Sequence, residues 1–167
     1  MAAEPGPKQL VTLLEAAPQR LAAATSGAPR RALHTPPEPG EWSATEVLAH
    51  MRACSDMWGG AILSILNDRP ATLRAVNPVT WIKSTDYPDL DFKHSLRAYT
   101  AQRETLALVL RSLPAQEWER SVLVTGGGTP LRRSVLDYAR RLARHERPHL
   151  KQIAASVKTL SRPQERP

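Results

Sequence analysis

Three histidines of this chain have a spacing that could bind a divalent metal ion. His145 and His149 are four residues apart near the C-terminus, and His50 lies in the first third of the chain. Residues four apart on a helix share one face, about 6 Å apart along the axis, so both rings could reach one ion. Neutral imidazole is the commonest side-chain metal ligand. Three such rings inside a helical protein would form an open site, with one position left for water or substrate.

The alternative is that each histidine is a core or boundary residue with ordinary hydrogen bonds. For a single histidine this is the simpler interpretation. For three histidines that fall in apolar helical stripes, spacing favours the metal site, because unpartnered imidazoles buried in one core would be costly. His34, in a proline-rich loop, and His94, in the first turn of a predicted helix, are interpreted as surface residues.

Apolar residues recur at helical spacing in four segments that would have to position these histidines. The first segment is 8–24, in which Pro18 is expected to kink or divide the helix. The second begins after Ser43, where Glu46 three residues later predicts a capping box, and it ends near Leu66. His50 lies on the apolar stripe of this second helix, between Val47 and Cys54.

Two further helices follow in the second half of the chain. Asp91 is the predicted cap of a helix over 92–112. Thr129 is the predicted cap of the last helix, with Pro130 at its first position. In this last helix His145 and His149 occupy the apolar seam that a bundle would bury.

These segments predict an all-α protein with a four-helix bundle as its single domain. The domain is expected over 8–157, between loose tails at 1–7 and 158–167. The segment 25–40 is predicted to be a loop. The longer connection 67–90 is expected to pack over the bundle, and 121–129 to form a short extended piece with a glycine turn.

The composition limits the classes of partner. The 167 residues carry a net charge of +7, but the arginines are spread along the chain and lack interleaved aromatic residues, so nucleic-acid binding is not favoured. There is no apolar run long enough to cross a membrane and no secretory signal. A single cysteine, Cys54, excludes an internal disulfide and fits a reducing compartment. We therefore expect a cytoplasmic protein that does not bind membranes.

Several residues near the histidines could assist chemistry, but each has a simpler structural role. Glu146 is expected to point away from the seam and pair with an arginine at the surface. Arg103 could meet an anionic substrate, although a snorkelling side chain is the commoner case. Cys54 and Tyr138 are interpreted as core residues, and Pro148 as a tolerated kink.

The sequence also resembles a known family. The stretch from Pro39-Gly40-Glu41-Trp42-Ser43 to His50, and the stretch from Asp137-Tyr138 through His145-Glu146-x-x-His149 to Gln152-Ile153, resemble the DinB/YfiT-like superfamily. The resemblance covers about residues 8–157. It implies a four-helix bundle with up-down-down-up helix directions and often a homodimer. It also implies a divalent metal held by three histidines, which by position are His50, His145 and His149.

The resemblance suggests how such a metal would be used. Some members activate a low-molecular-weight thiol for transfer, others are described as hydrolases, and many have no assigned reaction. The leading hypothesis is therefore a metal-dependent enzyme that activates a thiol or water for a small-molecule substrate, with thiol-dependent transfer ahead of hydrolysis. Zinc or nickel is the expected metal, although three imidazoles also suit iron or copper. A non-enzymatic, stress-related metal-binding bundle is the alternative.

Overall fold

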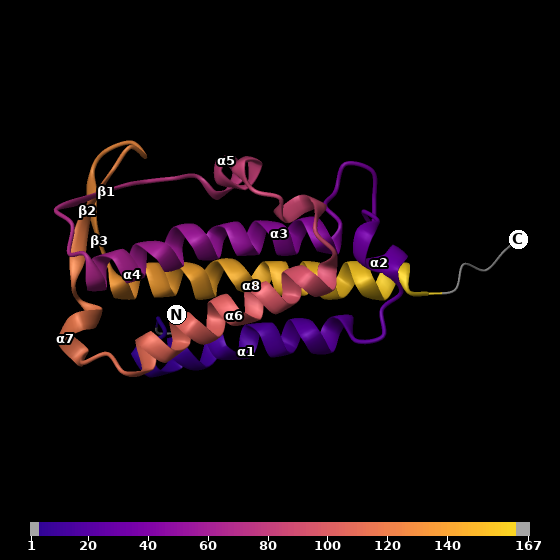
Figure 1. Cartoon of the computed structure of the whole chain (residues 1–167). Helices are drawn as coiled ribbons and strands as arrows, with labels where there is room; N and C mark the ends of the chain where they lie inside the picture. Colours follow the sequence, from indigo (N-terminus) through magenta and orange to yellow (C-terminus); the bar gives the residue numbers. More distant parts are fainter. Residues whose placement is uncertain (1–3, 163–167) are drawn as a thin grey trace, which may run out of the picture.

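The computed structural model describes residues 4–162, which form a helical bundle with a small sheet at one end (Figure 1). The long helices of the bundle are α1 (Pro7–Thr25), α3 (Ala44–Cys54), α6 (Phe92–Arg111) and α8 (Val135–Leu160). Both α1 and α3 pack against α6 and against α8, so α6 and α8 lie diagonally across the bundle. The predicted four-helix bundle is thus confirmed, while the up-down-down-up order of directions stays a prediction.

A three-stranded sheet corrects the expectation of an all-α fold. Its strands are β1 (Thr72–Arg74), β2 (Ser121–Thr125) and β3 (Leu131–Ser134), in the order β1-β2-β3. β1 runs parallel to β2, and β3 runs antiparallel to it. Only the β2 segment was expected to be extended, because its partners lie in segments that read as a connection and as the start of a helix.

The connections contain short helices that were not predicted from the sequence. These are α2 (Arg30–His34), α5 (Pro78–Trp81), the 3-10 turns η2 (Ile82–Ser84) and η3 (Tyr87–Asp89), and α7 (Ala115–Trp118). The elements α5, η2 and η3 all contact α3. The expectation that the connection 67–90 packs over the bundle is therefore confirmed.

Side-chain caps fix where most of the long helices begin. The predicted capping box is present: the Glu46 amide donates to Ser43 Oγ at 3.2 Å, and the Ser43 amide donates to Glu46 Oε2 at 2.8 Å. Asp91 caps α6 as predicted. The predicted start of the last helix at Thr129 is wrong. Ser134 is the cap there, because the preceding residues pair with β2 as a strand.

The second bundle helix contains one π-helical turn. α3 passes into η1 (Ser55–Gly59), a π-helix, and continues as α4 (Gly60–Asn67). Such π turns insert one residue into a helix and are frequent at functional sites. Pro18 and Pro148 do not interrupt their helices: α1 and α8 each continue as one α-helix through the proline. Among residues 4–162, no helix has the length and apolar character needed to cross a membrane.

The apolar core is divided into two clusters by a polar layer. Along α8, Leu142 belongs to one cluster and Ile153 to the other, and His145, Glu146 and His149 lie between them. The same division occurs on α6, where Arg103 separates Tyr99 from Leu106. At the level of the histidines the bundle therefore buries the charged side chains of Arg103 and Glu146 between the two apolar clusters.

Candidate metal centre

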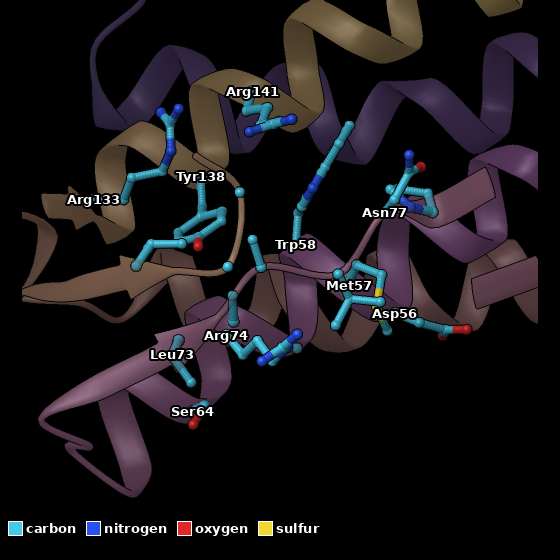
Figure 2. A pocket seen from close by; sticks show the side chains of 18 of the residues that line it. Asp56, Met57, Trp58, Ser64, Leu73, Arg74, Asn77, Arg133, Tyr138 and Arg141 are labelled. Atoms are coloured by element: carbon cyan, nitrogen blue, oxygen red, sulfur yellow. The ribbon is translucent and has the colours of Figure 1, made fainter. Parts of the chain in front are cut away.

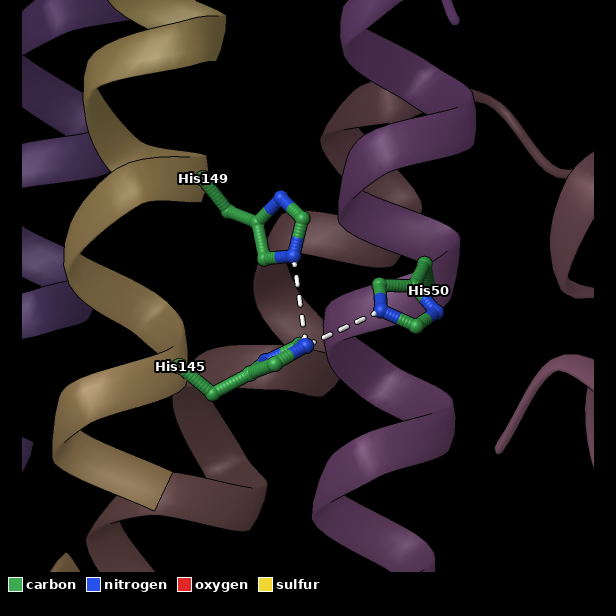
Figure 3. Close-up of side chains that lie close together, drawn as sticks. All are labelled: His50, His145 and His149. Atoms are coloured by element: carbon green, nitrogen blue, oxygen red, sulfur yellow. Dashed lines mark hydrogen bonds between the residues drawn. The ribbon is translucent and has the colours of Figure 1, made fainter. Parts of the chain in front are cut away.

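The three histidines singled out by their spacing come together between α3 and α8 (Figure 3). The Nε2 atom of His145 lies 3.2 Å from Nε2 of His50 and 3.3 Å from Nε2 of His149. One ligating atom from each ring can be chosen so that all three lie within 4.8 Å of one another. His145 is central to the cluster, since its Nε2 faces both of the other rings.

The two nitrogen separations at His145 match those of a tetrahedral metal site. A tetrahedral zinc ion with nitrogens at about 2.05 Å holds neighbouring ligands about 3.3 Å apart. Both measured Nε2 separations at His145 agree with that value. A neutral Nε2 carries either one proton or one lone pair, so His145 cannot donate a hydrogen bond to both neighbours. The donor set therefore fits a divalent cation.

Hydrogen bonding outside the cluster orients one of the rings. The Nδ1 atom of His149 lies 3.1 Å from Oε1 of Gln152, one turn further along α8. If Nδ1 donates this hydrogen bond, the lone pair of His149 is on Nε2, where it faces the other rings. The Nδ1 atoms of His50 and His145 are buried and have no partner among residues 4–162.

Two tryptophans and one cysteine surround the imidazoles. The Trp42 ring lies 5.3 Å from the His50 ring, and the Trp58 ring meets the His145 ring edge-on at 4.9 Å, both measured between centroids. Cys54 Sγ lies 3.6 Å from Nε2 of His50. Burial raises the pKa of the Cys54 thiol to about 12, so it is protonated near neutral pH. The expectation of a buried, unreactive Cys54 fits this environment.

The environment keeps two of the imidazoles neutral. Burial, followed by the positive charge that His149 would carry, lowers the pKa of His50. Burial also lowers the pKa of His145 to about 4, with further contributions from His149, His50, Arg141 and Arg103. Neutral imidazole is the form that binds metal ions. His145 therefore stays in its metal-binding form well below neutral pH, and the pKa of His50 is shifted in the same direction.

These lowered pKa values predict the pH dependence of stability in the metal-free protein. In the unfolded chain His145 takes up a proton near its ordinary pKa of 6.5, whereas in the folded protein it does so only near 4. The unfolded state therefore binds more protons between these values, and the free energy of unfolding should fall as the pH is lowered from about 6.5 to about 4.

Urea denaturation of chelator-treated protein across this pH range measures that fall. The variant His145→Gln cannot titrate at this position and should give a shallower decline. His94→Gln is the matched control, because His94 is exposed on α6, and it should decline like the wild type. Equal slopes for His145→Gln and the wild type would contradict the prediction.

A pocket of about 840 Å³ opens beside the histidines (Figure 2). Both His50 and His145 line it. Trp58 from the π-helical turn and Tyr138 from α8 also line it, although Tyr138 packs in the core as expected. The pocket is large enough for a small-molecule ligand. A coordination position left open by three histidines could therefore be reached from it.

Glu146 is buried, contrary to the expectation of an exposed salt bridge. It is 3% exposed, and its Oε1 accepts hydrogen bonds from Arg103 and, at 2.8 Å, from the Tyr99 hydroxyl. Arg103 does not snorkel to the surface but is 1% exposed. The pair joins α6 to α8 inside the bundle, at the turn of α8 that also carries His145.

The sequence matches a family of proteins over most of its length. The model of the DinB superfamily matches residues 13–153, a span that includes all three histidines. The chain belongs to the DinB superfamily. No curated protein matches it in sequence.

The fold of this DinB protein is also found in a solved structure. It is similar to YfiT from Bacillus subtilis, which is described as "a probable metal-dependent hydrolase with an unusual four-helix bundle topology". The TM-score is 0.78 at 17% sequence identity, and the match covers 96% of this chain and 90% of YfiT. At this identity the likeness establishes the fold alone.

Two arginines of this DinB protein were missed as candidate site residues. Arg133 and Arg141 line the pocket together with His145. From the sequence, both were considered only among the basic residues that could signal nucleic-acid binding. The spacing of Arg141 one turn before His145 was the signal that could have placed it beside the site.

Proposed function

We propose that the protein is a divalent-metal-dependent enzyme in which His50, His145 and His149 hold the metal. The observation that carries the proposal is the convergence of three imidazoles beside a pocket, with His145 Nε2 at 3.2 Å and 3.3 Å from the Nε2 atoms of the other two. Membership of the DinB superfamily supports it. Zinc or nickel is the metal we propose, although the same imidazoles could also hold iron or copper.

A bound divalent metal would act as a Lewis acid and lower the pKa of a water or thiol near neutral pH. The residues of this chain would provide the surroundings of that chemistry. Trp42 packs against the His50 ring, and Trp58 packs edge-on against the His145 ring. Tyr138 forms part of the pocket wall on which a substrate would rest. Gln152 holds His149 in one orientation.

Hydrolysis is the reaction that we place first. The expectation from sequence placed thiol transfer first, but the likeness to YfiT, described as a probable metal-dependent hydrolase, favours water as the nucleophile. Thiol-dependent transfer is the second candidate. It is favoured by the pocket volume of about 840 Å³, which could admit a low-molecular-weight thiol together with a second small molecule. A cytoplasmic location and a homodimer are also part of the proposal.

A paired activity screen tests the proposal. Chelator-treated protein is reconstituted with zinc, nickel, iron(II) or copper(II) and assayed for hydrolysis of ester, amide and phosphoester substrates. A parallel series follows conjugation of small thiols to electrophiles. Turnover should require metal and should be lost in His145→Ala, while His94→Ala retains it. If metal binds but no metal-dependent turnover is found in either series, the site is that of a non-enzymatic metal-binding bundle.

A further inference from the structure

We propose that Arg133 and Arg141 bind an anionic group of the substrate, a carboxylate or a phosphoryl group, beside the histidine cluster. Calling the bound molecule a substrate rests on the proposed function. The anion site itself depends only on side chains that are present without a metal.

Both arginines face the same space as the histidines. Arg133 comes from β3 and Arg141 from α8, and both line the 840 Å³ pocket. They also line an adjoining hollow of about 570 Å³, which reaches Trp58 and His145 as well. Figure 2 shows Arg133 and Arg141 on either side of Tyr138. An anion between the two guanidinium groups would therefore lie at the junction of the two hollows.

Aromatic stacking connects Arg141 to the histidine cluster. Its Cζ lies 4.4 Å from the centroid of the Trp58 ring, so the guanidinium covers one face of the indole. Trp58 in turn contacts His145 edge-on, so Arg141, Trp58 and His145 form one continuous row of contacts. A guanidinium that lies over an aromatic ring has fewer accessible conformations. Its N–H groups point outward in the plane of the guanidinium, so the ring does not block them. The stacking thus restrains the Arg141 guanidinium beside His145 before an anion arrives.

The two arginines are charged groups without a carboxylate partner among residues 4–162. Other arginines of the protein form ion pairs within 4.0 Å, among them Arg103, Arg120, Arg140 and Arg144. Neither Arg133 nor Arg141 has such a partner among the described residues. Burial and the nearby charge of Arg133 both lower the pKa of Arg141. Two like charges at a pocket wall favour an anionic ligand, which can accept bidentate hydrogen bonds from them.

The carboxylates of the two hollows already have donors of their own. Asp137 Oδ2 accepts from the Ser134 amide at 2.8 Å, as part of the helix cap. Asp56 accepts hydrogen bonds from the Tyr87 hydroxyl at 2.8 Å and from the side chain of Gln102. Glu4 pairs with other arginines, Arg140 and Arg144. The Arg133 and Arg141 guanidinium groups are therefore available to a ligand.

Anion binding to metal-free protein tests the inference. Isothermal titration and the indole N–H signal of Trp58 in a heteronuclear NMR spectrum follow additions of succinate, methylphosphonate or the uncharged succinamide. The variants are Arg133→Gln and Arg141→Gln, with Arg141→Lys to restore the charge. Arg132→Gln is the matched control, because Arg132 is exposed and successive strand residues point to opposite faces. Thermal melting shows that each variant is folded.

One of the anions should bind and shift the Trp58 signal, while succinamide should not. Each glutamine variant should weaken that binding about tenfold or more, since each removes charge-assisted hydrogen bonds, and Arg132→Gln should leave it unchanged. Arg141→Lys should recover part of the affinity. Stronger binding of succinate or of methylphosphonate distinguishes a carboxylate from a phosphoryl group.

The absence of anion binding at millimolar concentrations, or equal affinity in the wild type and both glutamine variants, would overturn the inference. Because the protein carries no metal in this experiment, that result is independent of the metal-dependent turnover that tests the proposed function. Conversely, if the protein binds the anion but shows no metal-dependent turnover, the proposed enzymatic function is wrong and the anion site is supported.

Discussion

Replacing His145 with alanine is expected to lower the affinity for zinc or nickel by at least about a hundredfold. Its Nε2 is the nitrogen that lies within 3.3 Å of both other Nε2 atoms, so its loss breaks both close contacts of the cluster. Changes to groups that merely orient a metal ligand typically cost tenfold to about a hundredfold in affinity, and loss of a ligand should cost more. His50→Ala and His149→Ala should also weaken binding.

Competition with a chromophoric chelator measures these affinities, and elemental analysis after dialysis gives the metal content. His94→Ala is the control, because it removes an exposed histidine from α6 and leaves the cluster intact. A metal that binds only the folded protein also stabilises it, so the thermal midpoint of the wild type should rise with metal and that of His145→Ala should not. Unchanged stoichiometry and affinity in all three cluster variants would rule out the proposed metal centre.

The helices that carry this centre were largely predictable from local sequence signals. The capping box at Ser43 and Glu46 and the cap at Asp91 are confirmed, because the partners in such caps lie within a few residues of each other. The start of the last helix was predicted at Thr129, five residues before the cap that the structure shows. Thr129 with Pro130 is a sound start, but β2 pairs with the residues that follow, so that the cap falls at Ser134.

The pair of histidines on α8 was predictable for the same local reason, since a spacing of four fixes a shared face. The placement of His50 beside them depends on packing between helices, which its apolar stripe could only suggest. The position of Glu146 was mispredicted because a narrow seam was assumed. A bundle helix that contacts two neighbours buries a wider face, and Glu146 lies on its flank.

The arginines of the pocket are placed by contacts between separate elements of the fold. Arg133 lies on β3, a strand that forms only by pairing with β2. The position of the Arg141 guanidinium depends on its stacking on Trp58. Trp58 itself lies in a π-helical turn that shifts the face it would occupy on a regular helix. Apart from the spacing of Arg141 one turn before His145, none of these relations is expressed in the sequence. The histidine pair on α8 was therefore predictable, while most of the pocket around it was not.

The second large effect is expected from the ion pair between α6 and α8. Arg103→Met should lower the free energy of unfolding by about 3–5 kcal/mol, because it leaves the Glu146 carboxylate buried without its charged partner. Burial raises the pKa of Glu146, whereas Arg103 and the hydrogen bond from Tyr99 lower it, so loss of Arg103 removes the main compensation for burial. Urea denaturation at neutral pH measures the loss.

The double variant Arg103→Met/Glu146→Gln separates the unpaired charge from lost packing. Glutamine is neutral and can still accept the hydrogen bond that the Tyr99 hydroxyl donates to Glu146. The double variant should therefore be more stable than Arg103→Met alone. Arg111→Met is the matched control, since Arg111 pairs with Glu15 at the surface, where an ion pair contributes at most about 1 kcal/mol.

Loss of the Arg103–Glu146 pair should also affect metal binding, because the pair lies at the same level of the bundle as the histidines. Glu146 follows His145 directly in α8, and the apolar clusters on both sides of this level are held in place by their own packing. If the pair sets the rotation of α8 at His145, Arg103→Met should weaken metal binding, and the double variant, which keeps the bond from Tyr99, should recover part of it. A double variant as unstable as Arg103→Met alone would show that packing of the arginine stem, rather than compensation of the buried charge, accounts for the stability at this level.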